Sequence, residues 1–201
     1  SSYSINVIAT DSGSLTATQA VTISVTDVNE APTLSSASTD SVAENTATST
    51  TVYTAIASDV DSGDTLTYSL SGTDSALFAI DSSTGTVTLV SAADYETQSS
   101  YSINIIATDS NTLTVTQAVT ISITDVNEAP TLSSSSTGSV AENAATTTTV
   151  YTAAASDVDS GDTLTYSLSG TDSASFAIDS STGALTLASA AAYETTAIYS
   201  V

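Results

Sequence analysis

The chain has 201 residues, among them 39 Ser, 39 Thr and 22 acidic residues, and it contains no Lys, Arg, His, Cys, Met or Trp. Its formal charge of −22 cannot be balanced by side-chain salt bridges, so the counter-charge has to come from solvent, a partner or a bound metal. Without basic residues we expect neither nucleic-acid binding nor direct membrane contact, and without His or Cys there is no Ser-His-Asp triad and no ordinary zinc site.

The sequence repeats itself with a period of 98 residues. Residues 1–103 align without a gap on residues 99–201, and 84 of the 103 aligned positions are identical. Such a period has the size of a domain, and both prolines of the chain lie in the recurring Asn-Glu-Ala-Pro-Thr stretch between the repeats. We therefore divide the chain into the C-terminal strands of one repeat (1–30), a complete repeat (31–128) and the N-terminal part of a third repeat (129–201).

The first and last repeats are each only partly present. Either the sequence is a window on a long array, or residues 129–201 of one chain are completed by residues 1–30 of the next. The second arrangement predicts an open-ended, head-to-tail filament of identical chains. The chain has no Met and no apolar run long enough for a signal peptide or a transmembrane span, which indicates a segment of a longer protein.

Within the complete repeat, apolar and polar residues alternate as they do in half-buried β-strands, and no window has a convincing helical period. Strands are expected near residues 41–44, 51–58, 65–71, 77–81, 86–90, 100–108 and 114–125. The stretch from Asp81 to Gly85 predicts a hairpin turn that needs glycine, because only glycine takes a positive φ without penalty. Seven strands in just under 100 residues predict an all-β fold of tandem seven-stranded Greek-key β-sandwiches.

The acidic residues of the complete repeat are concentrated in five short motifs. In chain order these are Ala43-Glu44-Asn45, Asp59-Val60-Asp61-Ser62-Gly63-Asp64, Asp94-Tyr95-Glu96, Ala107-Thr108-Asp109 and Asp125-Val126-Asn127-Glu128-Ala129-Pro130. Because the strands of a Greek key alternate in direction, the Asp59 and Asp109 loops are expected at the entry end of a repeat and the other motifs at its exit end. The acids of successive repeats would then repel one another across the linker. Calcium, which takes about six to eight oxygen ligands, would relieve this repulsion.

In order and spacing, these five motifs resemble the calcium motifs of cadherin repeats, and most of all those of the tandem cadherin-like domains of large bacterial surface adhesins. The resemblance covers essentially the whole chain and implies calcium ions that stiffen the linkers, two or three at each junction. For the junction at 125–128 the implied ligands are Glu44, Asp94, Glu96, Asp125, Asn127, Glu128, Asp157 and Asp159. For the junction at 27–30 they are Asp27, Asn29, Glu30, Asp59, Asp61 and Asp109. At the end of the last repeat the resemblance leaves Glu142 and Glu194, because Ala192 replaces the counterpart of Asp94.

Four other acids have simpler structural interpretations. Asp64 and Asp162 are expected to be turn residues at the start of a strand, and Asp81 and Asp179 to open the Ser-Ser-Thr-Gly turns.

Repeats of such similarity indicate a spacer, a calcium-stiffened stalk or fibre of an extracellular or cell-surface adhesin whose partners are neighbouring repeats. An enzyme built on paired carboxylates would need a cleft that a small repeated sandwich does not offer, so no enzymatic activity is expected. A carbohydrate-binding β-sandwich module is the alternative. Exposed aromatic platforms are scarce for that role, since the chain has nine Tyr, two Phe and no Trp.

Overall fold

The computed structural model describes residues 1–190 and residue 192. The chain separates into two compact units, one of Ser1–Ala93 with Ser100–Thr124 and the other of Asp94–Ser99 with Asp125–Val201. Regular structure in the described residues consists of β-strands and two 3-10 turns of three residues each. No helix among these residues is long and apolar enough to cross a membrane.

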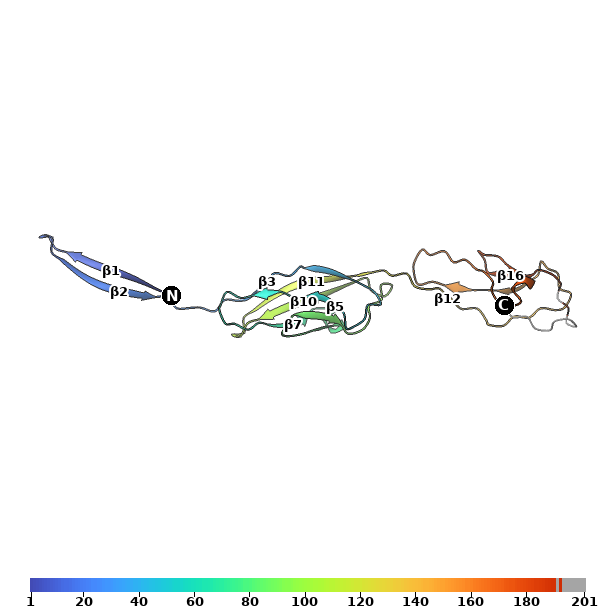
Figure 1. The fold of residues 1–201 in the computed structure, drawn as a ribbon, viewed down its shortest axis with the longest axis horizontal. Helices are drawn as coiled ribbons and strands as arrows, with labels where there is room; N and C mark the ends of the chain where they lie inside the picture. Colours follow the sequence, from blue (N-terminus) through green and yellow to red (C-terminus); the bar gives the residue numbers. More distant parts are fainter. Residues whose placement is uncertain (191, 193–201) are drawn as a thin grey trace. The chain divides into compact units, whose positions relative to one another are not determined.

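The first unit begins with an antiparallel hairpin (Figure 1). Its strands are β1 (Ser2–Thr10) and β2 (Thr16–Ser24), which pair along their whole length. They form a sheet of their own, and all nine residues of β1 are exposed. The alternating apolar residues of this hairpin therefore lie at the surface.

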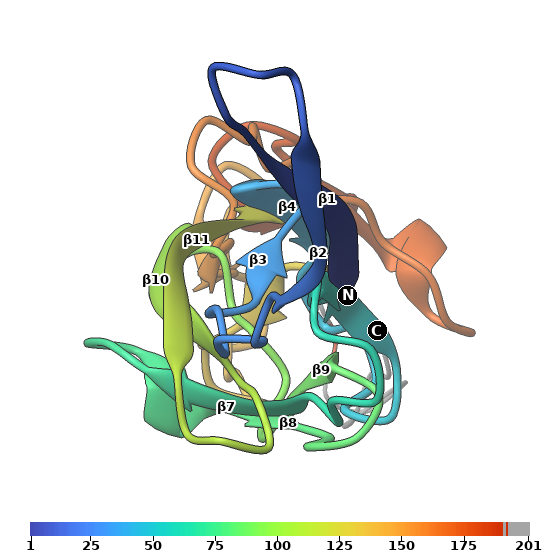
Figure 2. The ribbon, with the colours of Figure 1, turned by 90° about the vertical axis from the view of Figure 1, so that its left-hand side faces the viewer.

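The same unit contains a β-sandwich (Figure 2). Its strands are β3 (Thr33–Leu34), β4 (Thr39–Ala43), β5 (Thr51–Thr54), β6 (Ala57–Ser58), β7 (Thr67–Ser71), β8 (Phe78–Ile80), β9 (Thr86–Leu89), β10 (Ser100–Thr108) and β11 (Thr114–Thr124). One sheet has the order β4-β11-β10-β7, another has the order β5-β9-β8, and β3 pairs with β6. These pairs are antiparallel except β4 with β11, which run parallel. The all-β sandwich expected from the sequence is confirmed.

Alternate residues of β10 and β11 form the core of the sandwich. Ile103, Ile105 and Ile121 have no exposed surface, whereas the residues between them on each strand are less buried. The ring of Phe78 on β8 packs edge-to-face against Tyr101 on β10, with the ring centroids 5.6 Å apart. This contact joins the two larger sheets. The apolar residues that recur at every second position of β10 and β11 therefore form the core.

The turn between β8 and β9 depends on Gly85. This residue has a φ of +70°, and a Cβ on it would lie 2.7 Å from the backbone oxygen of Ala55. Asp81 caps the turn, since its Oδ1 accepts the N–H groups of Thr84 at 2.8 Å and Ser83 at 2.9 Å. These hydrogen bonds, Thr84 first, hold the pKa of Asp81 below its ordinary value. The predicted hairpin and the turn role of Asp81 are thus confirmed.

One expected strand is divided between two sheets. Residues 51–58 form β5, which pairs with β9, and β6, which pairs with β3. The change of partner occurs at Ala55 and Ile56. Ala55 donates its N–H to the oxygen of Gly85, and the oxygen of Ile56 accepts the N–H of Ser35, both at 2.9 Å. A pattern of alternating residues does not reveal such a change, because it does not say with which strand each segment pairs.

The second unit repeats part of this sandwich. Its strands are β12 (Thr131–Leu132), β13 (Thr149–Thr152), β14 (Ala155–Ser156), β15 (Phe176–Ile178) and β16 (Ala184–Leu187). They pair as β12-β14 and β13-β16-β15, which reproduces the pairing β3-β6 and β5-β9-β8. Residues 137–141 and 165–169 occupy the sequence positions of β4 and β7 but are not strands. In the first unit β4 and β7 pair with the β10-β11 hairpin, and the described part of this repeat contains no counterpart of that hairpin.

Candidate metal centre

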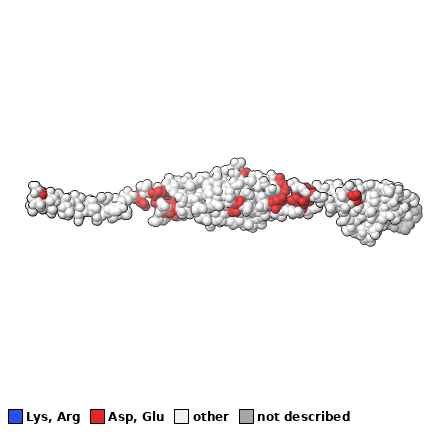
Figure 3. All heavy atoms as spheres, turned by 90° about the horizontal axis from the view of Figure 1, so that it is seen from above, with Lys and Arg blue, Asp and Glu red and all other residues white. Residues whose placement is uncertain are grey.

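The acidic side chains gather in groups, as the red surfaces in Figure 3 show. In one group, Asp59, Asp64 and Asp109 each offer a carboxylate oxygen, and these oxygens all lie within 4.8 Å of one another. Asp59 follows β6 and Asp109 follows β10, so the alternation of strand directions brings the two loops together. This is the meeting of entry-end acids that the sequence predicts.

The carboxylate of Asp109 is buried, with 5% of the residue exposed, and is held by several donors. Its Oδ1 accepts the N–H groups of Leu113 at 2.8 Å and Asn111 at 2.9 Å, and its Oδ2 accepts the side-chain amide of Asn29 at 2.7 Å. Burial acts to raise the pKa of Asp109, but these hydrogen bonds outweigh it and hold the pKa below its ordinary value. Asp109 is therefore an anchored anion that also fixes the linker residue Asn29.

The linker is bound to the next repeat in the same way at two places. The backbone N–H of Glu30 donates to Oδ2 of Asp61 at 2.8 Å, and 98 residues later the N–H of Glu128 donates to Oδ2 of Asp159 at 2.8 Å. Desolvation, followed by the charges of Asp61 and Asp27, raises the pKa of Glu30. The predicted linker acids thus lie in a field of like charge, which a cation would relieve.

The counterpart loop of the last repeat forms two overlapping groups. Glu96, Glu128 and Asp159 have oxygens that lie within 4.8 Å of one another, and so do Asp157, Asp159 and Asp162. Asp159 belongs to both groups, and its N–H donates to Oδ1 of Asp157 at 3.1 Å. The shared aspartate makes this loop the place where acids from three motifs of the sequence meet.

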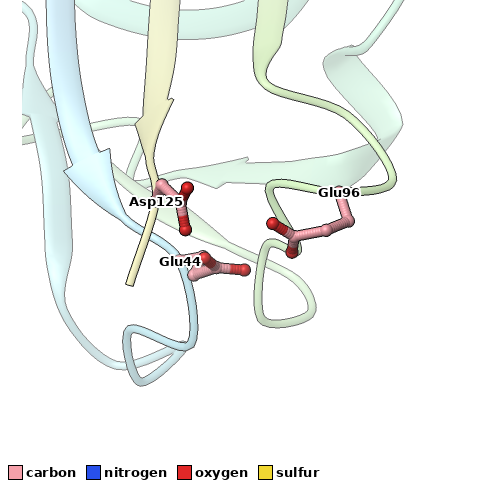
Figure 4. Close-up of side chains that lie close together, drawn as sticks. All are labelled: Glu44, Glu96 and Asp125. Atoms are coloured by element: carbon pink, nitrogen blue, oxygen red, sulfur yellow. The ribbon is translucent and has the colours of Figure 1, made fainter. Parts of the chain in front are cut away.

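A further group consists of Glu44, Glu96 and Asp125, whose side chains are drawn in Figure 4. One oxygen from each lies within 4.8 Å of the other two. Glu44 and Asp125 come together because β4 and β11 are parallel neighbours that end side by side, and the N–H of Glu44 donates to the oxygen of Thr124 at 3.0 Å. Glu44 is buried, with 4% of the residue exposed.

Some predicted ligands lie outside these groups. Both oxygens of Asp94 accept hydrogen bonds from Thr97, one from its N–H at 3.0 Å and one from its hydroxyl at 2.9 Å. The side-chain amide of Asn127 donates to the backbone oxygen of Glu128 at 2.9 Å. Glu142 is exposed, and Glu194 lies outside the described residues. Asp27, Glu30 and Asp61 are also absent from the groups. The ligand roles of all the residues named from the sequence stay predictions.

Two residues in the groups were assigned only a turn role from the sequence. Asp64 lies beside Asp59 and Asp109, and Asp162 lies beside Asp157 and Asp159. Asp64 also accepts a hydrogen bond from the hydroxyl of Ser110 at 2.5 Å. The signal that could have found them is the spacing Asp-x-Asp-x-x-Asp in both repeats, which places a third carboxylate in the same tight loop.

The donor set fits a hard divalent cation. Calcium binds oxygen at about 2.3–2.6 Å, so two ligands of one ion lie no more than about 5 Å apart. The oxygens Asp59 Oδ2, Asp64 Oδ2 and Asp159 Oδ1 are buried and have no hydrogen-bond partner among the described residues. Such buried anionic atoms are costly without a counter-charge, and the chain has no Lys or Arg to supply one. Fold and site together define a repeat array of β-sandwiches with carboxylate-lined linkers.

Comparisons with known proteins identify the family of these β-sandwich repeats. A model of the Cadherin domain matches residues 39–124 and 136–201. Human Protocadherin Fat 1 is 32% identical over 145 residues, which are 67% of this chain and 3% of that protein. The crystal structure of mouse Cadherin-23 EC22-24 is 29% identical with a TM-score of 0.67, and the match covers 94% of this chain and 64% of that one. The chain therefore belongs to the cadherin-domain family, and it spans only a small part of the curated relative.

Membership of this family confirms the coarser sequence predictions. Cadherin domains are adhesion modules of extracellular regions rather than enzymes, and they bind calcium at inter-domain junctions. Human Protocadherin Fat 4 is a second relative, 37% identical over 134 residues, which are 63% of this chain and 3% of that protein. These relatives come from animals, so the closer likeness to bacterial surface adhesins stays a prediction.

Proposed function

We propose that this chain is a calcium-stiffened spacer of an extracellular adhesin or surface fibre, of the bacterial type that the motifs resemble. The observation that carries the proposal is the set of buried carboxylate oxygens without a donor, grouped within 4.8 Å of other carboxylates in a chain that has no basic side chain. A divalent cation is the simplest counter-charge for such groups.

Each junction takes two or three calcium ions. At 125–128 the ligands come from the groups around Glu96, Asp125 and Asp159, and at 27–30 from the group around Asp59 and Asp109. The N–H groups of Glu30 and Glu128 donate to Asp61 and Asp159 and hold the linker beside these acids. Calcium then restricts the remaining motion of the linker, and the partners of each repeat are its neighbours in the array.

The test is calcium titration by isothermal calorimetry, together with small-angle scattering in calcium and in EGTA. The variant Asp159→Asn removes a charge shared by two groups, and we expect it to weaken calcium binding at least tenfold. The matched control is Asp179→Asn, because Asp179 caps a turn of the same repeat through the N–H groups of Ser181 and Thr182. Equal calcium affinity in the two variants, or scattering that is the same with and without calcium, would contradict the proposal.

A further inference from the structure

One group of carboxylates belongs entirely to the complete repeat. It consists of Asp59, Asp64 and Asp109, and one oxygen of each residue lies within 4.8 Å of the oxygens of the other two. The motifs of the sequence imply ligand roles for Asp59 and Asp109, whereas Asp64 is expected only to be a turn residue. The position of Asp64 between two implied ligands indicates that it has a further role.

Two oxygens of this group are buried and have no hydrogen-bond partner among the described residues, namely Oδ2 of Asp59 and Oδ2 of Asp64. The other oxygen of each residue has a neutral donor. Oδ1 of Asp59 accepts the N–H of Asp61 at 3.0 Å, and Oδ1 of Asp64 accepts the hydroxyl of Ser110 at 2.5 Å. Each aspartate is thus fixed through one oxygen, while its other oxygen is buried without a donor. A buried carboxylate oxygen in this state is costly unless a cation binds it.

The third carboxylate, that of Asp109, is the most buried of the group, with 5% of the residue exposed. Its donors are the N–H groups of Asn111 and Leu113 and the side-chain amide of Asn29. These donors are all neutral, so they hold the carboxylate in place without removing its charge. The chain has no Lys, Arg or His that could supply a counter-charge to any of the three carboxylates.

The neighbouring Asp61 has a different partner, although the sequence groups it with Asp59. It lies outside the group of three, and its Oδ2 accepts the N–H of the linker residue Glu30 at 2.8 Å. In the loop Asp-x-Asp-x-x-Asp, the first and third aspartates therefore join Asp109, while the second holds the linker. This division of roles leaves Asp64 as the second carboxylate that the loop contributes to the group.

The loop is built so that Asp64 returns toward Asp59. Gly63 has a φ of +107°, which allows the chain to reverse, and the N–H of Asp64 donates to the oxygen of Asp61 at 3.4 Å. Ser110 directly follows Asp109, so its hydrogen bond to Asp64 ties this loop to the one after β10. The two loops thus hold their carboxylates in one place.

The corresponding loop of the last repeat has the same arrangement. Asp157, Asp159 and Asp162 have oxygens that lie within 4.8 Å of one another, and Gly161 has a φ of +109°. Oδ1 of Asp159 is buried and has no hydrogen-bond partner among the described residues. The third aspartate of the loop therefore lies beside the first in both repeats.

We infer that Asp64 is a direct ligand of a calcium ion that Asp59 and Asp109 also bind, and that Asp162 has the same role beside Asp157. Three carboxylates within 4.8 Å match the spacing of ligands around calcium, which binds oxygen at about 2.3–2.6 Å. Asp59, Asp64 and Asp109 belong to one repeat, so their ion needs no acid from the preceding repeat. The inference rests on the calcium binding proposed above and adds a ligand to it.

The first experiment measures calcium binding to the full chain by equilibrium dialysis. The variant Asp64→Asn removes one charge, while its amide oxygen can still accept the hydroxyl of Ser110. We expect the Kd of one ion to rise at least tenfold. The matched control is Asp40→Asn, because Asp40 is an exposed acid of the same repeat whose Oδ1 accepts the N–H of Ser41. This control should bind calcium as wild type does. Equal binding by Asp64→Asn and Asp40→Asn overturns the inference.

The second experiment separates a ligand from a turn residue by calorimetry in EGTA and in calcium well above both Kd values. In EGTA, Asp64→Asn should be at least as stable as wild type, because it relieves repulsion among three carboxylates. A tenfold rise in Kd is about 1.4 kcal/mol, so calcium should raise Tm of the variant by about 6–11 °C less than that of wild type. A turn role alone would lower Tm equally in both conditions, and that result would refute the ligand role.

The two proposals fail in different ways. A wild-type chain that binds no calcium contradicts the proposed function and, with it, the role of Asp64. A wild-type chain that binds calcium, together with an Asp64→Asn variant that binds it equally well, contradicts the role of Asp64 alone.

Discussion

Replacing Ile103 by Ala measures how far the sandwich depends on the apolar face of β10. The substitution removes three carbon atoms from a side chain with no exposed surface. At about 0.8 kcal/mol for each buried carbon, the transfer loss is about 2.4 kcal/mol, and the cavity left behind raises the total to about 3–5 kcal/mol. For a domain of about 100 residues each 1 kcal/mol shifts Tm by about 4–8 °C, so we expect Tm of the sandwich to fall by about 12–40 °C.

The matched control is Ile5→Ala, at the same position of β1. Ile5 is 47% exposed, so its truncation should leave Tm of the sandwich within about 3 °C. The assay is differential scanning calorimetry. A loss below about 1 kcal/mol for Ile103→Ala, or equal shifts for the two variants, would refute the assignment of β10 to the core and of β1 to the surface.

Three further outcomes follow from calcium, glycine and pH. Chelation with EGTA should lower Tm by about 10–20 °C relative to a sample with calcium at 100 times its Kd, because binding at that concentration adds about 2.7 kcal/mol to the free energy of unfolding. An unchanged calorimetric profile would contradict calcium binding. Gly85→Ala should lower the free energy of unfolding in urea by more than about 2 kcal/mol, since Gly85 has a φ of +70° and an added Cβ would lie 2.7 Å from the oxygen of Ala55. At Gly63 an added Cβ would meet no atom within 4 Å, so Gly63→Ala should cost only about 1–2 kcal/mol. Equal losses for the two variants would contradict the contact at Gly85. The pKa of Asp81 is lowered in the folded state, so its carboxylate stabilises the fold above the unfolded pKa of about 3.8 and loses this effect as the pH falls through the folded pKa. Asp81→Asn should therefore be less stable than wild type at pH 6 and equally stable near pH 2. A difference in stability that does not change with pH would contradict this linkage.

The strands β10 and β11 could be predicted because buried and less buried residues alternate along them. Tyr101, Ile103 and Ile105 point inward from β10 with polar residues between them, and this pattern needs no knowledge of the partner strands. The division of residues 51–58 could not be predicted, since it depends on tertiary hydrogen bonds of Ala55 and Ile56 with distant loops. Hydrogen bonds between segments far apart in sequence leave no local periodic signal.

The candidate site was predictable to the level of motifs but not of single ligands. The alternation of strand directions brings the Asp59 and Asp109 loops together, as expected. Within a loop, however, the direction of a side chain decides whether a carboxylate binds its own turn or lies beside other carboxylates. Both oxygens of Asp94 accept hydrogen bonds from Thr97, whereas an oxygen of Asp64 lies close to oxygens of Asp59 and Asp109. The sequence does not show these directions, and from it Asp94 is expected to be a ligand and Asp64 a turn residue.

The absence of basic residues has a consequence for how the linkers are ordered. A chain without Lys or Arg cannot stiffen a junction by ion pairs, so it uses neutral donors, as the N–H of Glu30 toward Asp61 and the amide of Asn29 toward Asp109 show. Neutral donors leave the carboxylate charge in place, and they bring more of it together at the linker. The hydrogen bonds that order the linker therefore create the electrostatic cost that a divalent ion removes. Linker order and cation binding favour one another for this reason, and each should weaken when the other is lost.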